Sequence, residues 1–175
     1  CDLTGADLTG ADFHHTVLFR CFLQEANAAR ARFVAVRAAE THAPWLRAPG
    51  ADLTLAAFVD SDLSEAVLAG ASYDRTSFLN TSLQRADLSG SRLNRSVLLR
   101  ADLREAKLDG TVFDNVILIE ANLAGRDLSG FDLTLTQLMS ADLSGTVLRG
   151  AKLRQCNFKD ADLTRADLSG ADARN

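Results

Sequence analysis

Several residue types on which common functional sites depend are scarce in this sequence. Its 175 residues include three cysteines, three histidines, two prolines and one tryptophan. The cysteines lack CxxC spacing, and the histidines lack the spacing of metal ligands and any Ser or Cys nucleophile motif. These absences predict a protein with no catalytic residue, bound metal or cofactor, and therefore not an enzyme.

Long apolar runs and an excess of one charge are also missing. No stretch of about 18 apolar residues and no signal peptide is visible, so we expect a soluble, cytoplasmic protein that does not contact membranes. The 23 acidic and 19 basic residues give a net charge of −4 and are mixed along the chain. This distribution argues against direct nucleic-acid binding.

A five-residue repeat organises the whole chain. Residues 161–170 read ADLTRADLSG, which is two copies of a small residue, Asp or Asn, a large apolar residue and two further residues. The large apolar residue always falls at a number ending in 3 or 8, and 30 of these 35 positions between Leu3 and Ala173 hold Leu, Phe or Tyr. We call this third residue of each repeat the central residue and the first one the small residue.

A period of five fits neither a continuous helix nor a continuous strand. In a helix the central residues would wind around the whole surface, and in a strand they would alternate between its two faces. The pattern is satisfied if the backbone turns a corner after every repeat, so that central and small residues both point inward. Glycine recurs at intervals of 20 residues from Gly50 to Gly170. This spacing predicts coils of four repeats, stacked roughly 4.8 Å apart.

The A(D/N)LXX repeats resemble the pentapeptide-repeat family across nearly the entire chain. The resemblance implies an all-β fold, a right-handed, four-sided (quadrilateral) parallel β-helix solenoid with about 20 residues per coil. We expect residues 1–175 to form a single domain of somewhat under nine coils. Because the chain begins at Cys1 and ends near Ala173 already in phase, without polar caps, we expect a segment of a longer protein, or disordered or proteolysed ends.

Two stretches depart from the pattern. Residues 36–50 lose the signature, with alanine at three successive central positions and both prolines of the chain, so we expect an irregular loop or one distorted coil there. Trp45 in this stretch is either an anchor for recognition or a cover over the alanine-filled core beside it.

Arg126 and Phe131 form the second departure, because they stand at small positions. Since arginine cannot be buried there without a partner, we expect a bulge or an outward turn of Arg126.

The three cysteines, Cys1, Cys21 and Cys156, also occupy small positions. This placement favours their interpretation as small buried substitutes for alanine. Cys1 and Cys21 are one coil apart, which is close enough in principle for a disulfide.

One of the four faces carries apolar residues at positions that should point outward. A contiguous apolar row over five coils is roughly 20 Å long and is typical of an interaction surface. The alternative is that outward strand positions tolerate aliphatic residues because these pack along the ladder. The residues predicted to bind protein are Phe19, Val59, Leu79, Val97, Leu99, Ile117, Ile119 and Met139.

Two functions are compatible with these features. The first is a non-catalytic scaffold or docking module for protein–protein interaction, in which the apolar face joins two copies as a homodimer, docks a partner or lies under another domain. The resemblance adds that family members occur in larger bacterial proteins, including secretion-accessory proteins and effectors.

The alternative, also implied by the resemblance, is a DNA mimic that binds DNA gyrase, a type II topoisomerase, and confers resistance to quinolones or toxins. A DNA mimic needs a continuous acidic stripe. Here Asp62, Asp102 and Asp142 alternate with Ser82 and Asn122, so we rank this function second.

Overall fold

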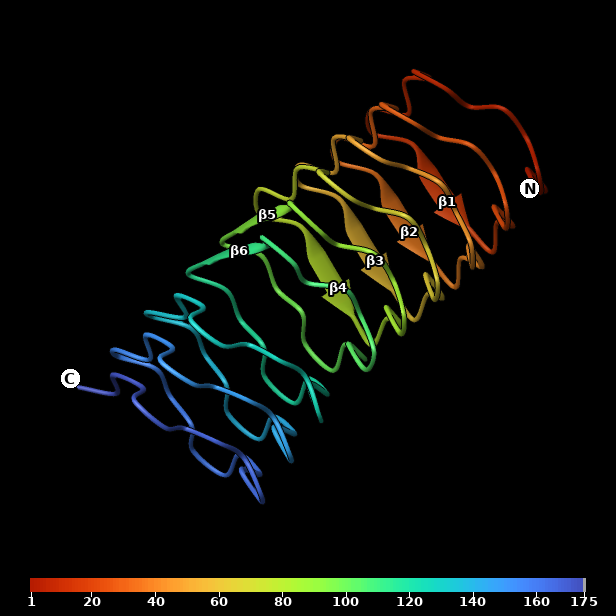
Figure 1. The fold of residues 1–175 in the computed structure, drawn as a ribbon. Coiled ribbons are helices and arrows are strands. Elements are labelled where there is room, and N and C mark those ends of the chain that lie inside the picture. The colour runs from red at the N-terminus through yellow and green to blue at the C-terminus, as the bar shows by residue number, and fades with distance from the viewer. Residues whose placement is uncertain (175) are drawn as a thin grey trace.

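The computed structural model describes residues 1–174, which form a right-handed four-sided parallel β-helix with its two termini at opposite ends of a rod (Figure 1). Successive coils pair in parallel, each residue with the one 20 positions further along the chain. None of the described residues forms a helix that could cross a membrane. The named strands are β1 (Val17–Phe19), β2 (Arg37–Ala39), β3 (Ala57–Val59), β4 (Ser77–Leu79), β5 (Arg92–Asn94) and β6 (Val112–Asp114).

The four sides of the rod are numbered here by the central residues of the first coil. Face 1 contains Leu3, face 2 Leu8, face 3 Phe13 and face 4 Leu18, and each face recurs every 20 residues. Strands β1 to β4 form one parallel sheet on face 4, whereas β5 and β6 pair on face 3. Isolated bridges continue the same register toward the C-terminus.

Each position of the repeat has a distinct role, which the first repeat illustrates. Asp2 accepts the Thr4 amide through Oδ1 at 3.0 Å, and the Ala6 amide closes a turn onto the Leu3 carbonyl at 3.0 Å. Gly5 occupies the corner with a φ of 65°, a left-handed conformation that costs glycine no steric energy. The turn is therefore of the type that places a positive φ at its third residue.

The core is a column of stacked side chains. Central residues such as Leu83 and Leu103 are fully buried, and Phe58 stacks on Phe78 with ring centroids 5.4 Å apart. Most buried hydroxyls at small positions are hydrogen-bonded, as Thr76 Oγ1 shows by donating to the Leu53 carbonyl at 2.7 Å, whereas Thr136 Oγ1 has no partner within residues 1–174. These bonds offset the cost of burying a polar group.

Residues 36–50 differ from the sequence-based expectation, because they form a regular coil and not a loop or distorted turn. Large and small residues have exchanged places there: Leu46 and Val36 are buried at small positions next to Ala48 and Ala38. The exchange nearly conserves volume, since the enclosed void beside these residues measures only about 10 Å³.

Pro44 and Pro49 also fit the regular coil. Both follow a central residue, at the turn position whose amide does not join the coil-to-coil ladder; in the first repeat that amide, from Thr4, bonds a side chain. Proline is favoured at this position, because its fixed φ matches the turn. The loss of the donor therefore costs the ladder nothing.

The cysteines divide between two states. Cys1 and Cys21 form a disulfide between adjacent coils, with Cα atoms 4.7 Å apart. Cys156 is free and half-buried, and its thiol donates to the Leu133 carbonyl at 2.9 Å. Burial raises the pKa of the Cys156 thiol, so this group is a poor nucleophile at neutral pH.

Candidate functional site

All eight residues predicted to bind protein project outward from face 4 and form two columns. Val59 pairs in register with Leu79, and the Asn80 amide bonds to the Leu99 carbonyl at 2.9 Å. The same ladder continues through Ile119 and Met139. Val97 pairs with Ile117 in the second column. We call the outward residues Val59, Leu79, Val97, Leu99, Ile117, Ile119 and Met139 the apolar row.

Side chains of the apolar row are half-buried, because each one packs against its neighbours one coil away. Ladder packing therefore accounts for part of their burial. Phe19 lies two coils before Val59, separated by Ala39, and remains 53% exposed. Its ring contacts the guanidinium of Arg20 at 4.9 Å from the ring centroid.

A polar rim borders the row at the corner between faces 4 and 1. Arg20 pairs with Glu40 and Arg100 pairs with Glu120, both with N–O distances of 2.7 Å. The hydrogen bond from Arg100 lowers the pKa of Glu120, so that pair stays charged at neutral pH. These two pairs neutralise part of the rim, whereas Asp60 is hydrogen-bonded to the uncharged Asn80 at 2.6 Å. The rim is therefore polar beside the apolar row.

The sequence interpretation missed two residues at the opposite edge of face 4. Leu55 and Leu135 occupy corner positions immediately before this face and are 46% and 45% exposed. Both have a positive φ, of 60° and 65°, which is unfavourable for leucine. The sequence signal that could have identified both is a large apolar residue at a corner position, which elsewhere holds a turn residue.

Replacing Leu135 by Asn should stabilise the fold by about 1 kcal/mol, because asparagine tolerates the left-handed conformation better than leucine. The free energy of unfolding from urea titration measures this effect. Thr134→Asn, at the preceding position with ordinary φ, is the matched control and should give no gain. A loss of stability in Leu135→Asn would show that Leu135 makes stabilising contacts that outweigh the strain.

Trp45 does not join the apolar row, since it stands at the corner between faces 1 and 2. Its indole Nε1 donates to Glu65 Oε2 at 3.1 Å, and half of the side chain is exposed. It lines a shallow depression of about 510 Å³ with Glu25 and Arg47. Trp45 therefore points away from the alanine-filled core and does not cover it.

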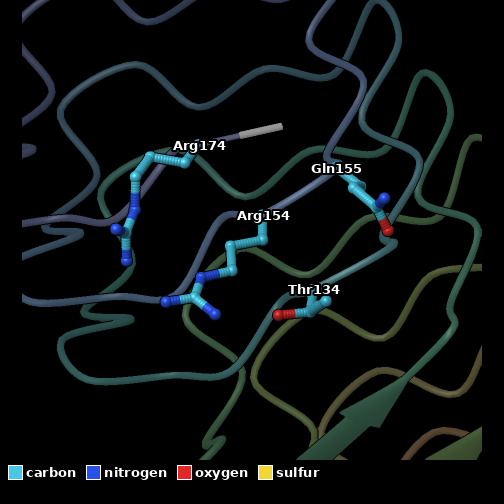
Figure 2. Close-up of a pocket in the computed structure, with 4 residues that line it drawn as sticks. All are labelled: Thr134, Arg154, Gln155 and Arg174. Atoms are coloured by element: carbon cyan, nitrogen blue, oxygen red, sulfur yellow. The ribbon is translucent and has the colours of Figure 1, made fainter.

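Another cleft, of about 420 Å³, lies near the C-terminal end and is lined by Thr134, Arg154, Gln155 and Arg174. Figure 2 shows the guanidinium groups of Arg154 and Arg174 extending to the same side, away from Gln155. Both are bound to Asp172, with N–O distances of 2.6 and 2.7 Å. They hold the pKa of the Asp172 carboxyl well below its usual range. This carboxylate neutralises much of the positive charge that an anion site would need.

The remaining chemistry of the described residues is sparse. Within residues 1–174, no group of three or more His, Cys, Asp or Glu side chains is placed to hold a metal ion. The frequent aspartates serve the backbone, as Asp7 does when it accepts both the amide and the hydroxyl of Thr9. Recognition through surface side chains is the activity that this geometry supports.

Comparison with known proteins agrees with the repeat geometry. The family described as Pentapeptide repeats matches in eight copies, over residues 1–33, 61–98, 96–134 and 141–175. The chain belongs to the pentapeptide repeat family. The unmatched stretch of this pentapeptide repeat protein between residues 33 and 61 contains the regular coil in which large and small residues exchange places.

The solved structures that are similar to this pentapeptide repeat protein include HetL and QnrB1. HetL, from the cyanobacterium Nostoc sp. strain PCC 7120 and involved in heterocyst differentiation regulation, is 28% identical; the match covers 98% of this chain and 84% of HetL, with a TM-score of 0.77. A trypsin-treated form of QnrB1, a plasmid-mediated fluoroquinolone resistance protein, is 18% identical over 91% of this chain and 92% of QnrB1, with a TM-score of 0.50. No significant match is found among curated proteins.

Proposed function

We propose that this pentapeptide repeat protein is a non-catalytic scaffold that docks another polypeptide, or a second copy of itself, on face 4. The observation that carries the proposal is the apolar row, whose members stand in register on consecutive coils from Val59 to Met139. Corresponding outward positions on face 2 hold small or polar residues, such as Ala69, Ser89 and Ser129. Face 4 is therefore distinguished from face 2 by its composition.

The dimensions and rigidity of face 4 suit docking. Five coils at roughly 4.8 Å give a strip about 20 Å long. A coil stack of this kind is preorganised, so little conformational entropy is lost on binding. The exposed edge residues Leu55 and Leu135 widen the strip on one side, and the polar rim borders the other. This arrangement of an apolar centre and a polar rim is typical of protein interfaces.

The comparison with HetL supports a role of this class. HetL is similar along nearly the whole chain and is involved in regulating differentiation. A regulatory role is compatible with binding another protein.

Replacing Leu99 and Ile119 together by lysine should abolish association through face 4 while leaving the rod folded. Both side chains point outward, so the lysine ammonium groups reach water, whereas a docked partner would have to bury them. Light scattering measures self-association, and pull-down from the source cell measures partner binding. Circular dichroism should show an unchanged β-signal in the double variant.

The matched control is lysine at Ser89 and Ser129, which occupy the equivalent outward position on face 2. This control adds the same charge and should leave the solution mass and the captured partner unchanged. If Leu99→Lys with Ile119→Lys also changes neither, face 4 is not the docking surface and the proposed function is wrong.

Gyrase binding by DNA mimicry has less support. On face 1 uncharged residues interrupt the row of aspartates, and Arg104 forms an ion pair with Asp102 with an Nη2–Oδ2 distance of 2.7 Å. His42 Nδ1 lies 3.3 Å from Asp62 on the same face. The resemblance to QnrB1, at 18% identity, concerns the fold alone.

A further inference from the structure

The coil stack is interrupted on two adjacent faces between the coils of residues 101–120 and 121–140, and we call this interruption the seam. In the part of the chain that the structure describes, every other pair of neighbouring coils keeps its bridges on all faces they share. Faces 1 and 4 of the two coils at the seam are also paired normally. The pairs missing at the seam are Lys107 with Asp127 on face 2, and Val112 with Asp132 on face 3.

Two oversized residues cause the seam. Arg126 and Phe131 replace the small residues of faces 2 and 3, and both stay half-buried between the coils. Arg126 Nη1 donates to the Ala106 carbonyl at 3.0 Å. One coil earlier the equivalent carbonyl, of Ala86, accepts the backbone amide of Lys107 at 2.9 Å. A side chain has thus replaced a ladder bond, and the outward turn of Arg126 expected from the sequence does not occur.

The seam opens as two clefts. The cleft on face 2 measures about 300 Å³ and is lined by residues 105–109 and 125–127 together with Phe131. The cleft on face 3 measures about 350 Å³ and is lined by residues 110–113 and 129–132. Phe131 belongs to both clefts, and its ring lies 5.8 Å from that of Phe113. In Figure 1 the seam lies directly beyond β6.

Both clefts expose backbone groups that are paired elsewhere in the rod. Leu88 and Gly90 donate their amides to the next coil at 2.9 and 2.8 Å. The corresponding amides of Leu108 and Gly110 have no such bonds across the seam. The buried Nε of Arg126 also lacks a hydrogen-bond partner within residues 1–174. Both kinds of unpaired donor are costly, and an incoming strand can satisfy the edge amides of Leu108 and Gly110.

We propose that the seam is a second binding site, which takes an extended segment of a partner polypeptide as an added β-strand. The partner's main-chain carbonyls accept from the free amides of Leu108 and Gly110. An apolar side chain of the segment packs between Phe113 and Phe131. Strand addition of this kind draws affinity from main-chain hydrogen bonds and specificity from side-chain pockets.

Charge at the mouth of the seam selects a basic segment. The lining residues carry four carboxylates, of Glu105, Asp109, Asp127 and Asp132. Glu105 is paired with Arg85 at 3.5 Å and Asp132 with Lys152 at 3.1 Å, so Asp109 and Asp127 are the two carboxylates that a basic segment can pair with. Side chains of a strand alternate between its two faces. A segment that alternates valine with lysine therefore directs valine to the phenylalanines and lysine to the carboxylates.

The test measures binding of a fluorescein-labelled peptide with the sequence Thr-Lys-Val-Lys-Val-Thr by fluorescence anisotropy. Two further peptides serve as controls: Thr-Glu-Val-Glu-Val-Thr reverses the charge, and Thr-Lys-Pro-Lys-Pro-Thr keeps the charge but loses both valine side chains and is held by proline at a φ of about −65°, away from that of a β-strand. Each control should bind at least about tenfold more weakly than the valine–lysine peptide. Equal binding of the proline peptide would reveal simple ion exchange and overturn the proposal.

A variant with Arg126→Ala and Phe131→Ser restores small residues and should close the seam. We expect it to lose peptide binding, and hydrogen exchange at the Leu108 and Gly110 amides should slow because the ladder now includes them. Arg47→Ala, which removes an exposed arginine on face 2 in the coil of residues 41–60, away from the seam, should bind like the parent. These readouts do not involve face 4, so they separate this proposal from the proposed function.

Two results would overturn the proposal. One is absence of binding to the parent protein at millimolar valine–lysine peptide. The other is undiminished binding by the double variant after hydrogen exchange has shown that its seam is closed. If the double variant unfolds, hydrogen exchange on the parent protein decides: protection of Leu108 and Gly110 on adding the peptide supports the proposal, and unchanged exchange refutes it.

Discussion

Deleting the single residue Gly90 should destroy the packing of the rod beyond that point. The deletion leaves one side of four residues, so the central residues of the following coil no longer stack on those of the coil before it. That coil would expose up to four buried Leu or Phe side chains, such as Leu98 and Leu103, at about 2 kcal/mol each. A loss of that size is comparable to the whole stability of an ordinary domain, about 5–15 kcal/mol. Thermal unfolding and limited proteolysis should report loss of the C-terminal half.

Removal of an entire coil, residues 81–100, is the matched control for that deletion. It removes twenty residues but preserves phase, so that residues 61–80 stack directly on residues 101–120. Stability in solenoids is approximately a sum over neighbouring repeats, and we expect a folded rod with a modestly lower Tm. If the variant that lacks Gly90 instead unfolds cooperatively at the Tm of the parent protein, the coil can accommodate one side of four residues. The strict phase requirement is then wrong.

The fold could be predicted from the sequence because every repeat forms the same local structure. The inward central residue, the turn-capping aspartate and the corner glycine recur at fixed intervals, and the structure places Leu3, Asp2 and Gly5 in those roles. The error at residues 36–50 arose from judging each position separately. Core volume is shared between positions, so Leu46 compensates for Ala48, and Pro44 occupies a turn position that needs no ladder amide.

The seam could not be predicted in the same way. Arg126 and Phe131 were visible as misfits, but an arginine at a small position can turn outward, bulge the chain or separate two coils. Which of these occurs depends on an acceptor in the preceding coil, here the Ala106 carbonyl. The positions of the apolar row followed from spacing alone. Leu55 and Leu135 were missed because corner positions are normally occupied by turn residues, whatever their polarity.

Acid should unfold this protein through the aspartates that cap its turns. Asp2 and Asp7 each accept an amide at 3.0 Å and a hydroxyl at 2.6 Å from a threonine two residues later. The hydroxyl bonds, followed by the amide bonds, lower the pKa of both carboxyls. At Asp167 the bonds from Ser169, with help from Arg149, lower the pKa to about 2. The same direction of shift at further repeats makes the effect cumulative.

The sign of the pH dependence follows from these depressed values. A carboxyl whose pKa is lower in the folded state stabilises the fold at pH values above its unfolded pKa, about 3.9, and loses that contribution as pH falls through its folded pKa. We expect a nearly constant Tm from pH 7 to about 5, and a steep fall between about pH 4 and 2. Differential scanning calorimetry across this range measures the profile.

Replacing capping aspartates by asparagine distinguishes the loss of turn capping from general repulsion among positive charges at low pH. Asn122 Oδ1 accepts the Ala124 amide at 3.1 Å, so the chain itself shows that an uncharged amide can cap the same turn. The variant Asp2→Asn with Asp7→Asn should therefore fold at neutral pH and lose less Tm than the parent between about pH 4 and 2. Repulsion alone would give the variant and the parent parallel profiles, and that outcome would exclude the capping carboxylates as the cause.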